Sequence, residues 1–407
     1  MRIATLAAVF GAALVAASLF VPAARAVALR LGAVDCPGKR RAHRQSTPRL
    51  GGIAVVVGAL AGLLAGLVFL YPELIPAGEH AHLAIVLTAT AVAVLGFLDD
   101  IRGLSPRVKL LGEVGLAIIL FGTGLRIERI EVPILGVLEL GGAASLAATV
   151  LWMVAVTNAF NLVDGVNGLA AGVGGITALG LVALGLVAEA PVVVILAAAL
   201  AGALFAFLRD NLRPGRIFLG DSGSLFLGFV LAAVTVQLGQ RAGRPVFPGV
   251  GVLLMGLPLV EIVTTVVRRT LRSRALRLGP AGVVSFLRRE LMHPDLGHLH
   301  HCLIRRGVRA EATADFLVGI AAVYCLASVI LFAIPSAEAP ASLAAIAVTA
   351  LCLAVCRPLA RRPHLELVVP AAGAASTVDI ATPMKPESIE IKSMEVESES
   401  EAELIAA

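Results

Sequence analysis

The sequence predicts an all-α integral membrane protein, a polytopic bundle of about 11 transmembrane helices with its catalytic loops on the cytoplasmic side. Of the 407 residues, 58% are hydrophobic and only 15% are charged, and the mean hydropathy is +0.93. Soluble domains carry about 25% charged residues, so this chain has too few to cover an aqueous surface. Its apolar runs are long and lack the period-two alternation of a membrane barrel.

A membrane-spanning helix needs about 20 apolar residues, and eleven stretches of the chain approach that length. The first resembles a signal peptide, with Arg2 before an apolar stretch and small residues at its end. We interpret it as an uncleaved span, because the basic loop that follows should stay in the cytoplasm. The candidate spans are roughly 3–24, 50–70, 83–98, 108–125, 143–160, 167–187, 191–208, 223–240, 247–267, 312–333 and 340–356.

The basic residues test this count. If the N-terminus lies outside and the spans alternate, 28 of the 33 Lys and Arg residues fall on the cytoplasmic side and the C-terminus lies inside. That bias is the one expected of membrane proteins. It also explains the net charge of +5 without a nucleic-acid partner. The cytoplasmic segments are then about 25–49, 99–109, 158–166, 209–222, 268–311 and 357–407.

Two segments differ from the spans. Between Arg126 and Leu140 polar and apolar residues alternate, which predicts a small external hairpin. Residues 1–360 are expected to form the membrane domain, whereas 361–407 is rich in Glu and predicted to be a disordered acidic cytoplasmic tail. The five cysteines show neither metal-site spacing nor a disulfide framework.

Polar motifs interrupt the apolar pattern in five loops, all on the predicted cytoplasmic side. Adjacent carboxylates at a membrane boundary are costly and need a reason. Carboxylate and amide oxygens suit Mg²⁺, which also takes substrate phosphates, and basic side chains neutralise a diphosphate. Together they indicate phosphoryl transfer at the membrane surface. The motifs are Ser46-Thr47-Pro48-Arg49-Leu50-Gly51-Gly52, Asp99-Asp100 with Lys109, Asn158 to Gly168, Phe218 to Ser224, and His298-Leu299-His300-His301.

Each motif also has a simpler explanation. Asp221, in Gly-Asp-Ser-Gly, could cap a helix, and the segment from Asn158 to Gly168 could end one. The histidines could bind zinc, although neither the His-Glu-x-x-His pattern nor a cysteine pair accompanies them. A membrane transporter is an alternative from another class, but transporters place coupling acids near the bilayer midplane, often within repeats. The sequence shows no such repeat.

From about residue 30 to 310, the order and spacing of the five motifs resemble the polyprenyl-phosphate N-acetylhexosamine-1-phosphate transferases of glycosyltransferase family 4. These include undecaprenyl-phosphate N-acetylglucosaminyl-1-phosphate transferases, and phospho-MurNAc-pentapeptide translocases are their relatives. The resemblance implies transfer of a sugar 1-phosphate from a UDP-N-acetylhexosamine to a polyprenyl phosphate, with release of UMP. It places this step first in cell-envelope polysaccharide synthesis, such as that of O-antigen or teichoic acid, at the bacterial inner membrane.

The resemblance also implies roles for the acids and the lysine. Asp99 would deprotonate or orient the lipid phosphate, and Asp100 would support metal and substrate. An acceptor phosphate is already ionised at neutral pH, so organising charge is the alternative role of Asp99. Lys109 would contact the diphosphate. Asp221, joined by Asn161, would hold Mg²⁺, with Mn²⁺ as an alternative ion.

Six further residues would contact substrate by the same resemblance. They are expected to seat the uridine, to build the polar network beside it, or to contact phosphate or sugar. Many bacterial members carry Asp where Asn167 stands here, and an amide still accepts a hydrogen bond without adding charge. The His-x-His-His form followed by Cys302 favours N-acetylglucosamine over MurNAc-pentapeptide, and a homodimer is left open. The six residues are Asn158, Asp164, Asn167, His298, His300 and His301.

Overall fold

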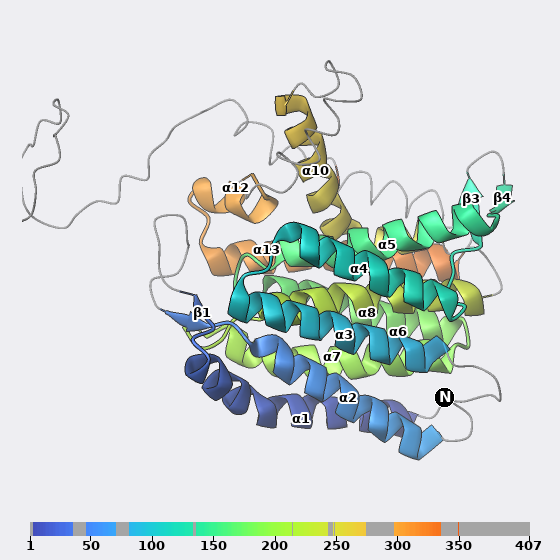
Figure 1. Ribbon diagram of the computed structural model, residues 1–407. Helices are drawn as coiled ribbons and strands as arrows, with labels where there is room; N and C mark the ends of the chain where they lie inside the picture. Colours follow the sequence, from blue (N-terminus) through green and yellow to red (C-terminus); the bar gives the residue numbers. More distant parts are fainter. Residues whose placement is uncertain are drawn as a thin grey trace, which may run out of the picture. The chain divides into compact units, whose positions relative to one another are not determined.

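Long helices run side by side through the unit Met1–Arg362 of the computed structural model (Figure 1). The predicted span at 340–356, apart from Thr349, and the predicted acidic tail lie outside the described residues. A second unit, Pro363–Ala407, lies outside them as well. The structure describes residues 3–35, 46–70, 81–132, 136–213, 215–242, 247, 249–273, 297–334 and 349.

Eight helices among the described residues are long and apolar enough to cross a membrane, by length and composition. A further helix, α4 (Pro106–Gly122), has 17 residues. The predicted all-α membrane bundle is therefore confirmed, whereas the count of eleven is not. The eight are α1 (Ile3–Arg30), α2 (Gly51–Leu70), α3 (Ala81–Arg102), α5 (Gly142–Val163), α6 (Leu169–Val187), α7 (Pro191–Asn211), α8 (Gly220–Arg241) and α13 (Ala310–Ala333).

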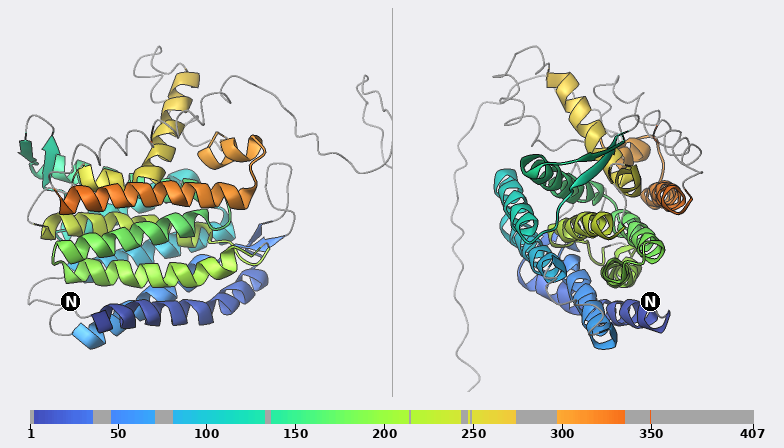
Figure 2. Two further views of the ribbon diagram at one scale, coloured as in Figure 1. Left: turned by 180° about the vertical axis from the view of Figure 1, so that it is seen from behind. Right: turned by 90° about the vertical axis from the view of Figure 1, so that its right-hand side faces the viewer.

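The predicted single span at 247–267 is wrong. The chain forms α9 (Gly249–Leu254), breaks at Met255, and continues as α10 (Gly256–Ser273). Gly256 and Pro258 follow the break, and proline lacks the N–H that would continue a helix from the preceding turn. α10 is inclined steeply to the other helices (Figures 1 and 2), so this stretch changes direction instead of crossing straight through.

The interior of the bundle is built around α8. Ninety-four per cent of the residues in its apolar window are buried, compared with 22% in α1. Seen along the helix axes in Figure 2, other helices surround α8, and its neighbours include α2, α3, α5, α6 and α7. Residues at the start of α8 are thus held from several directions.

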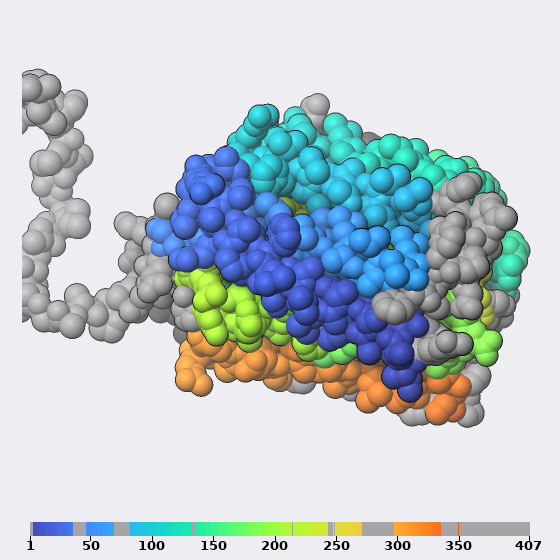
Figure 3. Space-filling model, turned by 90° about the horizontal axis from the view of Figure 1, so that it is seen from below, coloured from blue at the N-terminus to red at the C-terminus, as the bar shows by residue number. Residues whose placement is uncertain are grey.

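Small side chains allow the outer helices to approach closely. α1, α2 and α7 pack together through alanine and glycine, and a Cβ added at Gly62 would crowd Ala13 and Ala199. Close backbone approach at small residues is how helices associate in membranes. Figure 3 shows α1 and α2 in the middle of one face, between other helices. Leu19 of α1 and Leu64 of α2 are exposed. An apolar face of this kind suits lipid chains better than water.

Short strands and one short helix complete the unit. β1 (Val34–Asp35) pairs with β2 (Thr47–Pro48), and β3 (Arg129–Val132) pairs antiparallel with β4 (Gly136–Glu139). The second pair confirms the predicted hairpin between Arg126 and Leu140. The predicted histidine motif begins α12 (Leu299–Arg305), which packs against α13.

Candidate active site

The predicted polar motifs meet at one end of the bundle, called here the site end, where α3 and α5 finish and α4, α8 and α12 begin. The predicted spans ended at 98 and 160, before Asp99 and Asn161, and the histidine motif was expected in a loop; these boundaries are wrong, whereas Asn158 was within a predicted span. In the structure Asp99 lies in the last turn of α3, Asn158 and Asn161 lie in the last two turns of α5, and His300 lies in α12. α3 continues to Arg102, just before Gly103, and α5 to Val163, just before Asp164 and Gly165.

The Gly-Leu-Ser-Pro turn connects the two aspartates to α4. Gly103, with a φ of 66°, adopts the left-handed conformation that ends a helix. Ser105 then caps α4 and Pro106 occupies its first turn. This turn brings Lys109 back towards Asp99, so a spacing of ten residues becomes a direct contact.

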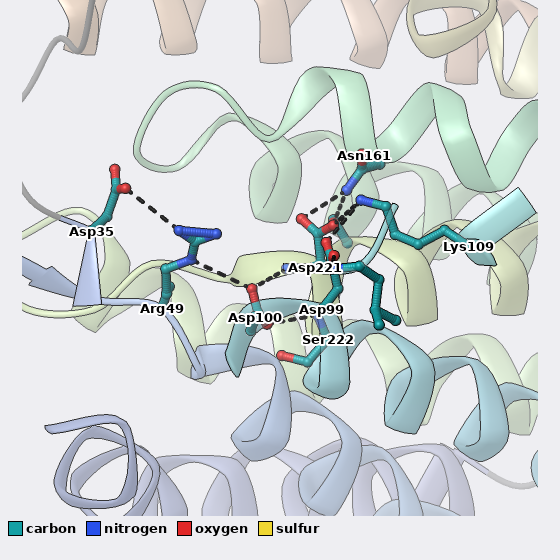
Figure 4. Close-up of polar contacts among 10 residues, drawn as sticks. Asp35, Arg49, Asp99, Asp100, Lys109, Asn161, Asp221 and Ser222 are labelled. Carbon is teal, nitrogen blue, oxygen red and sulfur yellow. Dashed lines mark hydrogen bonds and ion pairs between the residues drawn. The ribbon is translucent and has the colours of Figure 1, made fainter. Parts of the chain in front are cut away.

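Lys109 joins two carboxylates from different helices (Figure 4). Its Nζ lies 2.8 Å from Oδ2 of Asp99 and 2.7 Å from Oδ2 of Asp221. Oδ1 of Asp99 accepts a 2.6 Å hydrogen bond from the backbone N–H of Leu104. Asp99 therefore has both oxygens engaged, and a single cation already balances two acids.

Asp100 points away from Lys109 and holds the start of α8. Its Oδ1 and Oδ2 accept 3.0 Å hydrogen bonds from the backbone N–H groups of Asp221 and Ser222. Nε of Arg49 lies 3.6 Å from Oδ1 of Asp100, and the same guanidinium reaches Asp35 at 3.5 Å. The carboxylate of Asp100 thus satisfies N–H groups that α8 leaves open at its first turn.

Two glycines let the helices approach the start of α8. A Cβ at Gly96 of α3 would overlap the backbone of Asp221 and Ser222, and one at Gly52 of α2 would overlap that of Gly223. The chain before α2 also pairs with the chain before α8, because Phe218 N donates to Pro48 O at 2.7 Å and Gly52 N donates to Leu219 O at 2.8 Å. Asp221 therefore stands on a backbone fixed by both α2 and α3.

The two asparagines of α5 have different partners. Nδ2 of Asn161 donates to Asp221 Oδ1 at 3.1 Å and to Ser224 Oγ at 2.9 Å. Nδ2 of Asn158 donates instead to Glu113, an acid of α4 that is 1% exposed. Asn161 thus belongs to the acid cluster, defined as Asp99, Asp100, Lys109, Asn161 and Asp221, whereas Asn158 faces a neighbouring polar pair.

Asp164 follows the last residue of α5 and is half-buried. Burial, and then the negative charges of Asp221 and Asp100, raise its pKa to about 8, against the backbone N–H of Gly220 and the charge of Arg49. Asn167 lies in the following turn, and within the described part of the chain its side chain has no hydrogen bond. The structure therefore places Asp164 beside the acid cluster and gives Asn167 no specific contact.

The three histidines form a second group, the histidine cluster, defined as His298, His300 and His301. The rings of His298 and His300 stack with centroids 5.7 Å apart, and those of His300 and His301 are 4.3 Å apart. Burial, with smaller effects from His301 and His298, lowers the pKa of His300 to about 3, so that ring is neutral at pH 7. The ring of His300 lies against Gly165, which connects this cluster to the turn that carries Asp164.

Sequence reasoning missed three polar residues at this end of the bundle. Glu113 and Glu261 are buried, and each was a lone acid inside a predicted span, a pattern that could have identified them. Asn211, at the end of α7, accepts a 2.7 Å hydrogen bond from Gly168 N and donates a 3.0 Å bond to Ile217 O. It fixes the loop before α8, and no sequence pattern points to that contact.

Comparison with known proteins agrees with the predicted resemblance. Residues 82–239 match the model of the family described as glycosyl transferase family 4. A Bacillus subtilis protein named probable undecaprenyl-phosphate N-acetylglucosaminyl 1-phosphate transferase is 32% identical over 317 residues, which covers 77% of this chain and 81% of the relative.

Two further relatives carry related names. A decaprenyl-phosphate N-acetylglucosaminephosphotransferase of Mycobacterium tuberculosis is 33% identical over 312 residues, covering 70% of this chain and 72% of that protein. A phospho-N-acetylmuramoyl-pentapeptide-transferase of Desulforudis audaxviator is 37% identical over 216 residues, covering 48% and 64%. With five motifs assembled at one end of a membrane bundle and relatives matched over most of their length, the chain belongs to glycosyl transferase family 4.

Proposed function

We propose that this protein transfers N-acetylglucosamine 1-phosphate from its UDP-linked form to a polyprenyl phosphate. An oxygen of the lipid phosphate attacks the sugar-bearing phosphorus, the bond to the UMP oxygen breaks, and UMP leaves. The observation that carries this proposal is the contact of Lys109 with both Asp99 and Asp221 at the site end. Catalysis of phosphoryl transfer rests on positioned charge, and this arrangement supplies it without a covalent intermediate.

The residues of the acid cluster would have different roles in the reaction. Lys109 neutralises charge on the diphosphate, and Asp221 stands on a backbone held by Asp100. Asp99 orients Lys109 and the turn after α3, since both of its oxygens are engaged there. The lipid phosphate is ionised at neutral pH, so the mechanism does not require Asp99 as a base.

The oxygen atoms available in the acid cluster suit a Mg²⁺ ion whose remaining ligands come from the substrate. The Lys109 ammonium already brings oxygens of Asp99 and Asp221 to one cationic centre, and Asn161 contacts Asp221. Among the described residues no three His, Cys, Asp or Glu side chains form a ready metal site. Mg²⁺ commonly takes one or two carboxylates and the phosphates of the substrate. Asp221 and Asn161 would hold the ion, which would supply positive charge against the diphosphate, and Mn²⁺ is the alternative.

The relatives guide the choice of sugar. The two relatives whose names specify N-acetylglucosamine align over 70% or more of this chain, compared with 48% for the pentapeptide transferase. The His298-Leu299-His300-His301 form followed by Cys302 favours the same sugar. MurNAc-pentapeptide is the second candidate.

The basic residues near the site end support an orientation with the active site on the cytoplasmic face of the bacterial inner membrane. A reporter fused after Arg44 should then read cytoplasmic. A periplasmic signal from that fusion would reverse the orientation.

UMP release tests the reaction. Purified protein is incubated with undecaprenyl phosphate, Mg²⁺ and a panel of UDP-sugars. UMP should form with UDP-N-acetylglucosamine, stop on chelation of Mg²⁺, and fall by at least about 1000-fold in Asp221→Ala. Arg129→Ala, in the distant hairpin, is the matched control. Release with UDP-MurNAc-pentapeptide alone would move the protein to that substrate, and undiminished activity in Asp221→Ala would refute the site.

A further inference from the structure

A buried acid outside the acid cluster holds the histidine cluster in place. Glu261 belongs to α10, the helix inclined away from the bundle, and is 2% exposed. A carboxylate with so little access to water is costly unless several donors satisfy it. The proposed mechanism gives Glu261 no part, so a buried acid at this position needs another explanation.

The partners of Glu261 lie in the segment that carries the histidines. Its Oε1 lies 2.7 Å from Nδ1 of His298. Both carboxylate oxygens also accept from the backbone N–H of Leu299, at 3.2 and 3.1 Å. One side chain of α10 therefore fixes the first turn of α12 and the first ring of the cluster together.

These contacts decide which nitrogen of His298 carries hydrogen. Both oxygens of Glu261 already act as acceptors for Leu299 N–H, so the geometry assigns Nδ1 of His298 as the donor to Oε1. The other nitrogen, Nε2, then carries a lone pair and accepts a hydrogen bond from a ligand. The ring of His300 stacks on the ring of His298 and keeps the two ring planes nearly parallel.

We propose that Glu261 is a positioning residue, which holds His298 with its hydrogen on Nδ1 and presents the lone pair of Nε2 as an acceptor for a hydroxyl or amide N–H group of the sugar-nucleotide donor. The histidine cluster reaches the donor side of the site through the contact of His300 with Gly165, one residue from Asp164. The identity of that ligand rests on the proposed function, whereas the state of the His298 ring does not.

Glu261→Gln tests this role with little change of shape. The amide oxygen can still accept from Leu299 N–H, but the NH₂ group would donate to Nδ1 and move the ring hydrogen to Nε2. In protein labelled with ¹⁵N-histidine and held in lipid nanodiscs, we expect the His298 signal to change from the Nδ1–H form to the Nε2–H form. The eight histidines of the chain are few enough for His298→Gln to assign the signal by difference.

Kinetics provide the second readout. We expect Glu261→Gln to raise the KM for the UDP-sugar about tenfold and to leave kcat within about twofold. Glu311→Gln, an exposed acid in the first turn of α13, is the matched control and should change neither quantity. Melting curves identify misfolding, and the ligand-free ¹⁵N spectrum remains informative if activity is lost.

The outcomes separate the two proposals. If no UDP-sugar yields UMP with the unaltered protein, the proposed function fails, while the ring state of His298 is still measured. Hydrogen on Nε2 alone in the unaltered protein would overturn the role of Glu261. So would a Glu261→Gln variant whose spectrum and KM both match those of the unaltered protein.

Discussion

The acid cluster and the histidine cluster differ in how they are supported. Four helices of the bundle hold the acids, and their backbones meet where α3 and α8 cross. The histidines depend on Glu261 of α10, a helix that leaves the direction of the bundle. The two clusters of the proposed site are therefore supported by different parts of the fold, the acids by crossing helices and the histidines by one side chain of α10.

The largest effect is expected from Gly96→Ala, which would break the support of the acid cluster. The new Cβ would overlap the backbone of Asp221 and Ser222, which cannot rotate away as a side chain can. We expect a loss of about 3 kcal/mol in stability, at the upper end for overpacking, together with loss of UMP release. Thermal unfolding in detergent and the UMP assay measure the two effects.

Gly115→Ala is the control for that change. Gly115 also lies in a helix, α4, but no atom of the described structure lies within 4 Å of its added Cβ. Alanine favours helix over glycine by up to about 1 kcal/mol, so this variant should be no less stable than the parent. Equal melting temperatures for the two variants would contradict the tight crossing of α3 and α8.

Lys109→Met should reduce turnover without unfolding the bundle. Asp99 and Asp221 would then face each other without their shared cation, and the diphosphate would lose a counter-charge. Removing one preorganised charge of this kind costs about 100- to 1000-fold in kcat. Arg107→Met removes the same charge from an exposed position two residues earlier and should retain activity. A similar loss in both variants would show that only the net charge at the start of α4 matters.

Gly165→Ala should distinguish the role of the histidine cluster from that of the acid cluster. Its Cβ would overlap the ring of His300, and a ring can move where a backbone cannot. We expect the KM for the UDP-sugar to rise about tenfold with kcat nearly unchanged, since the acid cluster is not displaced. Gly319→Ala, in open space on α13, is the control. A fall in kcat as large as that of Lys109→Met would show that the clusters act as one unit.

The sequence was sufficient to predict the membrane bundle and the residues that meet at the site end. Charged and amide side chains stand out in a chain with 58% hydrophobic residues, and glycines mark the turns that carry them. Their partners could not be predicted. Asp100 and Asp99 are neighbours in sequence, yet Asp100 binds the backbone of α8 while Asp99 binds Lys109. Only the packing of α3 against α8, about 120 residues further along the chain, separates their roles.

Two other features escaped prediction for different reasons. The break at Met255 lies in an apolar stretch whose composition alone looks like one span, although Gly256 and Pro258 follow it. Glu261 was a visible signal, because it is a lone acid in that stretch. Its role depends on contacts with His298 and Leu299, which lie 37 and 38 residues further along the chain, and periodicity does not encode such long-range contacts.

The smallest effect is expected from Thr265→Val, which tests whether Glu261 alone positions the histidine cluster. Thr265 Oγ1 lies 3.4 Å from Nδ1 of His298, whereas Glu261 Oε1 lies 2.7 Å from it. Valine has nearly the shape of threonine, so the change removes only two long, weak contacts, the second being the 3.5 Å hydrogen bond that Nη2 of Arg268 donates to Thr265 Oγ1. We expect the KM for the UDP-sugar to stay within about twofold and stability to fall by less than about 1 kcal/mol. A tenfold rise in KM, equal to that expected for Glu261→Gln, would mean that the hydroxyl and the carboxylate orient the ring jointly. The histidine cluster would then be held by more than one side chain, as the acid cluster is.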